Sequence, residues 1–86
     1  MTTDFQAGQY ATRSPPDLRH RLARNLRRLR RARGLGQEGL AGAAKLSEAQ
    51  IRGIEASKIE VRIDTLQRIA DALGVRVFDL LDGGRP

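Results

Sequence analysis

The chain contains no cysteine, which excludes a disulfide framework and a thiolate metal site. Its only histidine is His20, and no pair of carboxylates stands near it to suggest a metal or acid–base centre. There is no glycine-rich phosphate loop, because Gly34-Leu35-Gly36 has the pattern of a helix end followed by a turn. We therefore expect no enzymatic activity, no metal and no cofactor.

Long apolar runs are also absent, and none approaches the roughly 20 residues of a membrane span. The first residues lack a basic segment followed by an apolar one, so we expect no secretory signal. These absences predict a cytoplasmic protein without membrane contacts. The 86 residues form one small domain with a limited core, which oligomerisation would help to stabilise.

What is abundant is positive charge. The net charge is +6, and fourteen of the sixteen basic residues are arginine. Eight arginines lie between Asp17 and Glu38 with no acid among them. DNA backbone is the commonest partner for such a density, although a solvated helix face in an arginine-biased sequence is the alternative.

The N-terminal third divides into an arm and a helix. Residues 1–16 are polar and unpatterned and end in two prolines, so we expect a flexible, disordered arm. A helix is predicted over 17–33, ending at Gly34, because leucines recur at helical spacing. These leucines are Leu18, Leu22, Leu26 and Leu29. The folded domain is expected over 17–82, followed by a tail at 83–86.

Two short helices joined by a tight turn are predicted between Gln37 and Glu55. The first, about 37–44, places Leu40, Ala41 and Ala44 on one face, and the second, about 48–55, places Ile51 and Ile54 on one face. Ser47 and Gln50 have the spacing of a capping box, which fixes the start of the second helix. Such a pair can present one helix to the DNA major groove.

Two more helices complete the chain. Leu66, Ile69, Ala70 and Leu73 form an apolar face that ends at Gly74, and a short helix follows over about 77–81. No convincing strand is present. The sequence therefore predicts an all-α protein with five helices in a compact bundle.

Seven segments, in this order and spacing, resemble the Xre/Cro-C1 family of helix-turn-helix DNA-binding domains over about residues 18–82. They are Leu26–Arg30, Gly34–Ala41, Leu46–Ser47, Ile51–Glu55, Thr65–Leu66, Ile69–Val75 and Leu80–Leu81. The resemblance implies a five-helix bundle of the lambda-repressor type that binds double-stranded DNA. Helix 37–44 would support helix 48–55, which would enter the major groove.

Helix 48–55 has five candidate base-reading residues: Glu48, Ala49, Gln50, Arg52 and Gly53. Arg52 can pair with guanine or bind a phosphate, and Glu48 can accept from cytosine or favour the helix dipole. Ala49 is small enough to approach a thymine methyl. Gln50 can cap Ser47 or bind adenine. Glycine at position 53 deletes a side chain that would otherwise reach a base.

The resemblance also implies contacts with DNA phosphates, which position a protein without specifying sequence. The candidates are Gln37, Ser47, Ser57, Lys58 and Arg62. A solvated loop charge is the alternative for Arg62. Lys45 and Ser57 stand where the family often has glycine, so Lys45 is expected to adopt a positive φ.

Arg30 and Glu55 match a family pair that forms an internal salt bridge. Each directly follows an apolar core residue, so both can lie at the edge of the interface between their helices. Arg30 is therefore assigned to structure rather than to DNA.

These observations predict a sequence-specific transcriptional regulator, a homodimer on a palindromic operator. Val77, Phe78 and Leu81 are the candidate dimer surface, although Phe78 and Leu81 can instead close the core. One alternative is an antitoxin that binds a toxin partner, with the arm folding on it, and regulates its own promoter. Another is non-specific nucleoid binding through the arginine helix.

Overall fold

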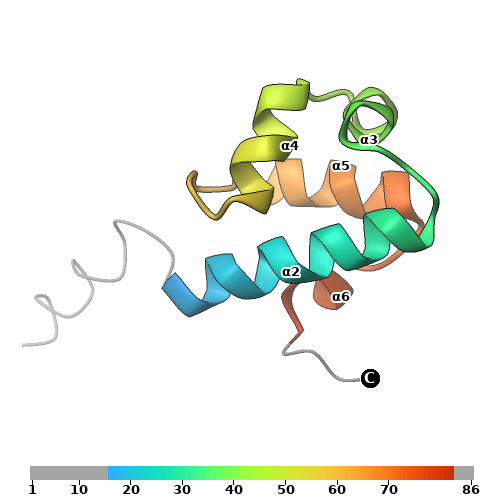
Figure 1. Cartoon of the computed structure of the whole chain (residues 1–86). Helices are drawn as coiled ribbons and strands as arrows, with labels where there is room; N and C mark the ends of the chain where they lie inside the picture. The colour runs from blue at the N-terminus through green and yellow to red at the C-terminus, as the bar shows by residue number, and fades with distance from the viewer. Residues whose placement is uncertain (1–15, 83–86) are drawn as a thin grey trace, which may run out of the picture.

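The computed structural model describes residues 16–82, which form five α-helices and no strand (Figure 1). The helices are α2 (Pro16–Ala32), α3 (Gln37–Ala44), α4 (Glu48–Glu55), α5 (Ile63–Leu73) and α6 (Val77–Leu81). The all-α, five-helix prediction is thus confirmed. The predictions of a flexible arm, and of an arm that folds on a toxin, fall almost wholly on residues outside the described range.

The helix ends follow the local sequence. α2 and α5 are each followed by a glycine, Gly34 and Gly74, and both have a φ of 71°. Only glycine adopts this left-handed conformation without a steric penalty, so both positions end their helices. α5 begins at Ile63, three residues before the first residue of the apolar face from which it was predicted.

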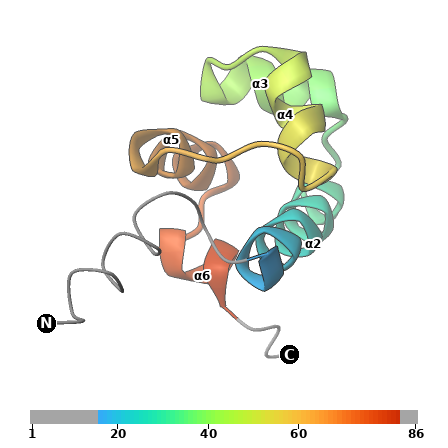
Figure 2. The ribbon, with the colours of Figure 1, turned by 90° about the vertical axis from the view of Figure 1, so that its left-hand side faces the viewer.

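A single core holds the helices together. α4 and α6 both pack against α2, while α3 packs against α4 and α5 (Figures 1 and 2). The largest fully buried apolar side chains come from all five helices. They are Leu26, Leu40, Ile51, Ile69, Leu73 and Leu80. No helix in residues 16–82 has the length and apolar character needed to cross a membrane.

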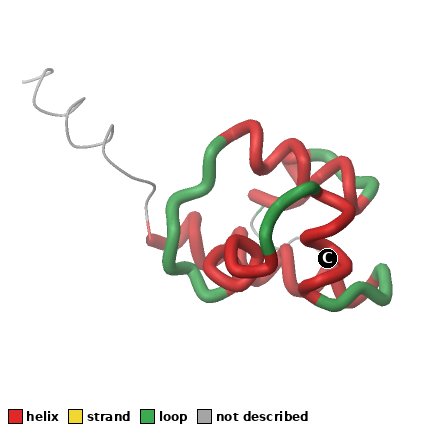
Figure 3. Tube along the Cα trace, turned by 90° about the horizontal axis from the view of Figure 1, so that it is seen from above, coloured by secondary structure: helices red, strands yellow, loops and turns green. Residues whose placement is uncertain are grey.

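Short connections, seen as green segments in Figure 3, join the helices. α6 is also tied to α2 by a buried side chain, because Asn25 Nδ2 donates to the carbonyl oxygens of Leu80, at 2.9 Å, and Asp82, at 2.8 Å. These carbonyls lie at the C-terminal end of a helix, where no later residue of the helix can donate to them. Asn25 therefore holds the end of α6 in place.

Candidate nucleic-acid interface

The α3–turn–α4 unit has a defined geometry at both ends of its turn. Ser47 Oγ accepts from the Gln50 N–H at 3.0 Å, and Gln50 Oε1 accepts from the Ser47 N–H at 2.9 Å. The predicted capping box is therefore confirmed. Lys45 ends α3 with a φ of 60°, as expected for a position that favours glycine. The turn thus fixes the direction in which α4 leaves α3.

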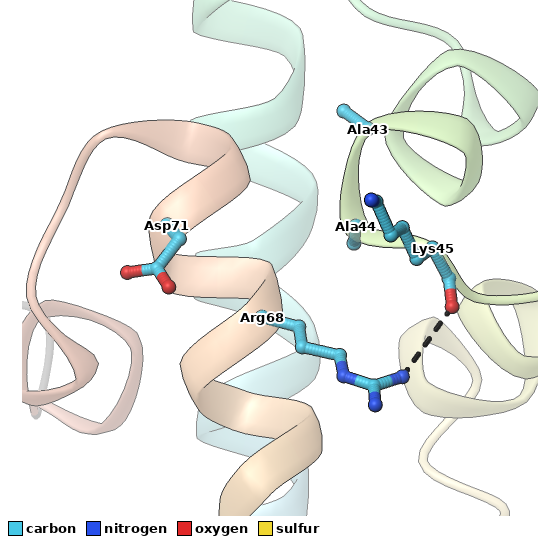
Figure 4. A pocket seen from close by; sticks show the side chains of 5 residues that line it. All are labelled: Ala43, Ala44, Lys45, Arg68 and Asp71. Atoms are coloured by element: carbon cyan, nitrogen blue, oxygen red, sulfur yellow. Dashed lines mark hydrogen bonds between the residues drawn. The ribbon is translucent and has the colours of Figure 1, made fainter.

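Side chains of α3, the turn and α5 line a shallow cleft beside the turn (Figure 4). Arg68 reaches across it and donates to the Lys45 carbonyl oxygen at 3.5 Å, while Asp71 lies on the α5 side. No part of residues 16–82 gathers three or more His, Cys, Asp or Glu side chains that could hold a metal ion.

A buried ion pair holds the C-terminal end of α4 against α2. Arg30 Nε lies 2.6 Å from Glu55 Oε2, and Arg30 Nη2 donates to Glu55 Oε1 at 3.0 Å. The structure thus contains the ion pair that the sequence predicts. Arg30 also donates to the Leu35 carbonyl oxygen, and Gln37 Nε2 donates to Glu55 Oε1 at 3.0 Å. Glu55 therefore joins α2, α3 and α4.

The Glu55 carboxylate is stabilised in its charged form despite its burial. Burial raises the pKa of Glu55, but hydrogen bonds from Arg30 and Gln37 and the charges of Arg30 and Arg27 together lower it below its ordinary value. The hydrogen bond with Glu55 raises the pKa of Arg30 against the opposing effect of burial. Both groups are thus charged throughout the physiological pH range.

Several arginines of the basic run bond to backbone carbonyls of other helices. Arg27 Nη1 donates to the Glu55 carbonyl oxygen at 2.6 Å, and Arg33 Nε donates to the Leu73 carbonyl oxygen at 2.8 Å. Both donate to free carbonyl oxygens at helix C-termini, where the helix dipole favours a cation. The sequence-based interpretation of the run as one DNA-backbone patch is therefore too broad.

Glu48 and Arg52 occupy the open face of α4 and form an ion pair with each other. Arg52 Nη1 lies 3.1 Å from Glu48 Oε2, and the two side chains are 55% and 46% exposed, in that order. Ala49, between them in sequence, is exposed. Glu48 lies in the first turn of the helix and Arg52 in its last turn, so the three residues form one exposed side of α4, while Ile51 and Ile54 are buried.

Two other predicted base-reading residues are placed differently from expectation. Gly53 is half-buried, and a Cβ added to it would lie 3.2 Å from Ile59 Cδ1. The structure therefore places it against the loop after α4 rather than on the open face. Gln50 is exposed, but its Oε1 is used in the capping box, which leaves its amide nitrogen as the group available to a base.

The predicted phosphate-contacting residues also divide into two groups. The Gln37 side chain is bound to Glu55, and Ser57 Oγ donates to the Arg19 carbonyl oxygen at 3.5 Å, so both side chains have partners within the domain. Lys58 is exposed, and the 84%-exposed Arg62 side chain pairs with the surface residue Asp64, at 3.2 Å. The exposed Ser47 retains its hydroxyl hydrogen as a donor.

The three candidate dimer residues do not share one environment. Val77 and Leu81 are partly buried and pack against the core, so Leu81 closes the core as the alternative proposed. Phe78 does not close the core, because its side chain is 60% exposed. Its ring lies 5.4 Å from the guanidinium carbon of Arg76. Only Phe78 among the three offers a mostly open apolar surface.

The geometry of this unit is that of a helix-turn-helix, and residues 21–80 match the family model described as "Helix-turn-helix domain". The chain therefore belongs to this family.

Among proteins of known description, it is 38% identical to the HTH-type transcriptional regulator DdrOP3 of Deinococcus deserti, over 73% of this chain and 49% of that protein. A hypothetical transcription factor of Neisseria meningitidis is 34% identical over 76% of this chain and 61% of that protein. The chain thus spans about half to three-fifths of these two relatives.

Two solved structures resemble the fold closely. The Neisseria transcription factor NHTF superposes with a TM-score of 0.74 and 34% identity, covering 76% of this chain and 73% of that one. The restriction–modification controller protein C.AhdI of Aeromonas hydrophila superposes with a TM-score of 0.70 and 31% identity, covering 72% of this chain and 94% of that one.

Proposed function

We propose that the protein is a sequence-specific DNA-binding transcriptional regulator that inserts α4 into the major groove. The observation that carries this proposal is the contrast between the buried and the exposed side of α4. Ile51 and Ile54 are buried and the buried Glu55 pair anchors the helix, whereas Glu48, Ala49 and Arg52 are exposed. A recognition helix needs this combination, because its reading residues must project from a rigid support.

Arg52 is the leading base-reading residue. To bind guanine it must leave Glu48, but an exposed pair four residues apart contributes only about 0.3–0.5 kcal/mol, so separation is easy. A bidentate contact with guanine is worth about 1–3 kcal/mol of discrimination, which exceeds that cost. Glu48, once released, is free to accept from a cytosine amino group.

Smaller roles are proposed for the neighbouring residues. Ala49 offers a methyl group to thymine, and the Gln50 amide nitrogen can donate to a base while its oxygen keeps the cap. We propose no base-reading role for Gly53, because it packs against Ile59. The base-reading surface is therefore narrower than the sequence suggests.

Phosphate contacts would position this surface. Lys58 and Arg62 are exposed in the loop after α4, and Ser47 is exposed at its start, so these three can flank a groove entered by the helix. Gln37 would contribute through the backbone N–H groups at the start of α3, where Gly36 provides no side-chain cap, rather than through its side chain. For Ser57 we propose support of the loop, since its hydroxyl bonds to α2.

We further propose that the regulator acts as a homodimer on a palindromic site. One eight-residue helix contacts only a few base pairs, so two half-sites are needed for useful specificity. Their centres would lie about 34–36 Å apart, one turn of the double helix. The mostly exposed ring of Phe78 is the part of the predicted interface that is available to a second copy.

Selection of binding sites from a pool of random duplexes tests this function. We expect enrichment of a two-fold symmetric sequence with guanine at a fixed position in each half-site. In the same selection, the Arg52→Ala variant should no longer enrich guanine at that position but should still enrich the other positions of the site. A wild-type pool that stays random after repeated rounds would contradict sequence-specific binding.

A further inference from the structure

Three arginines of α2 remain on the surface after the internal ones are accounted for. Arg24, Arg28 and Arg31 are all exposed. Their spacings of four and three residues place them on one face of the helix, which we call the arginine stripe. Within residues 16–82, no hydrogen bond or ion pair joins any of the three to another side chain. The stripe therefore differs from Arg27, Arg30 and Arg33, which the fold itself employs.

The stripe faces away from every helix that packs on α2. Arg27 and Arg30 reach toward α4, and Asn25 reaches toward α6. At about 100° per residue, the stripe occupies the remaining side of the helix, opposite Leu22 and Leu26. Figure 2 shows α2 nearly end-on, with α4 and α6 on two sides of it and the other side open.

This position is also remote from the proposed base-reading residues. α2 meets α4 through Arg27 and Arg30, which both bond to Glu55, whereas the stripe lies on the side of α2 that faces away from α4. In Figures 1 and 2 α2 runs along one side of the domain and the α3–α4 turn lies on the other. A duplex bound by α4 would therefore not cover the stripe.

The chemistry of the stripe favours a phosphate backbone as its partner. A protein interface normally has an apolar centre, but the exposed neighbours on this face, such as His20, provide no large apolar side chain. Arginine forks match phosphate oxygens, and seven residues of helix span about 10 Å. Along that length a duplex presents about six phosphate charges, enough to engage all three arginines.

We propose that the arginine stripe binds the backbone of a second DNA duplex, so that a molecule held at its operator through α4 bridges two DNA segments. This inference rests on the proposed function of α4. The three arginines would contact the phosphates of the second duplex without reading its sequence, and their affinity for it would fall steeply as the salt concentration rises.

A two-duplex capture assay tests the proposal. An enriched operator duplex is fixed on beads, the full chain is bound, and capture of a labelled random-sequence duplex is measured per molecule of bound protein. Arg24→Gln/Arg28→Gln is the test variant. Lys45→Gln/Arg68→Gln removes the same charge from the exposed turn and α5 (Figure 4) and is the control.

For the test variant we expect operator occupancy to be retained while the affinity for the second duplex falls on the order of 10- to 100-fold at 0.1 M salt. The slope of its logarithm against the logarithm of salt should decrease by about 1.8, the counterion term for two charges. The control should capture the second duplex as the wild type does.

The outcomes separate this proposal from the proposed function. If the test variant occupied the operator normally and captured the second duplex as well as the wild type does, the bridging role would be overturned. The stripe would then be solvated surface or a contact for an acidic protein. An equal loss of capture in the control would overturn it too, because it would show dependence on net charge alone. Failure of the wild type to occupy any enriched duplex would instead refute the reading role of α4.

Discussion

The buried pair of Arg30 and Glu55 makes a quantitative prediction about stability. Arg30→Ala removes both hydrogen bonds to the carboxylate, which is only 5% exposed, as well as the bond to the Leu35 carbonyl. Loss of one partner of a buried pair costs about 3–5 kcal/mol. Because Gln37 and Arg27 remain near Glu55, we expect the lower part of this range, about 3 kcal/mol.

A loss of about 3 kcal/mol is a large part of the about 5–15 kcal/mol that stabilises a domain. At about 4–8 °C per kcal/mol for this size, the melting temperature should fall by about 12–24 °C. Thermal unfolding followed by far-UV circular dichroism measures it. Arg28→Ala, an exposed residue of the same helix, is the matched control and should change the free energy of unfolding by about 0.5 kcal/mol or less. If the two variants melted together, the structural role of Arg30 would be refuted.

Three further outcomes follow from single side chains. Because the folded-state pKa of Glu55 is lowered, the stability it contributes is present above its unfolded pKa of about 4.3 and is lost as the pH falls through the folded value. In Glu55→Gln the free energy of unfolding should therefore fall less steeply than in the wild type as the pH is lowered. The same pH dependence in both proteins would contradict this. Gly42→Ala should raise the free energy of unfolding, measured in urea, by about 0.5–1 kcal/mol, because the added Cβ has no neighbour within contact distance. Gly53→Ala should raise it less, because Ile59 must shift to make room for the Cβ. Equal increases in the two variants would show that the packing of Gly53 on Ile59 does not affect stability. Phe78→Ser should leave the melting temperature of the monomer nearly unchanged and raise the dimer dissociation constant in sedimentation equilibrium, and an unaltered constant would exclude Phe78 from the interface.

The helices and their caps could be predicted from the sequence because both depend on residues close together in the chain. The capping box requires only Ser47 and Gln50, three residues apart, and the positive φ of Lys45 depends on the tightness of one turn. Periodic leucines likewise located α2. The clearest difference from the predicted helices is the start of α5. This helix begins at Ile63, before Leu66, the first residue of the apolar face from which it was predicted.

The distribution of the arginines could not be predicted in the same way. Arg27 bonds to a carbonyl 28 residues away and Arg33 to one 40 residues away, so each bond depends on how the helices cross. No spacing rule distinguishes these arginines from the exposed Arg28 between them. The Gln37–Glu55 bond and the packing of Gly53 on Ile59 arise from the same tertiary arrangement.

The most direct test of DNA reading by α4 is the ratio of affinities for an enriched duplex and a random one. For the wild type we expect a ratio of about 10³ or more at physiological salt, as for specific regulators. Arg52→Ala should lower the ratio about 5- to 150-fold, the equivalent of about 1–3 kcal/mol, while Arg68→Ala, at an exposed position of α5 outside the arginine stripe, should leave it unchanged. A wild-type ratio near one, or an Arg52→Ala ratio equal to that of the wild type, would contradict the account.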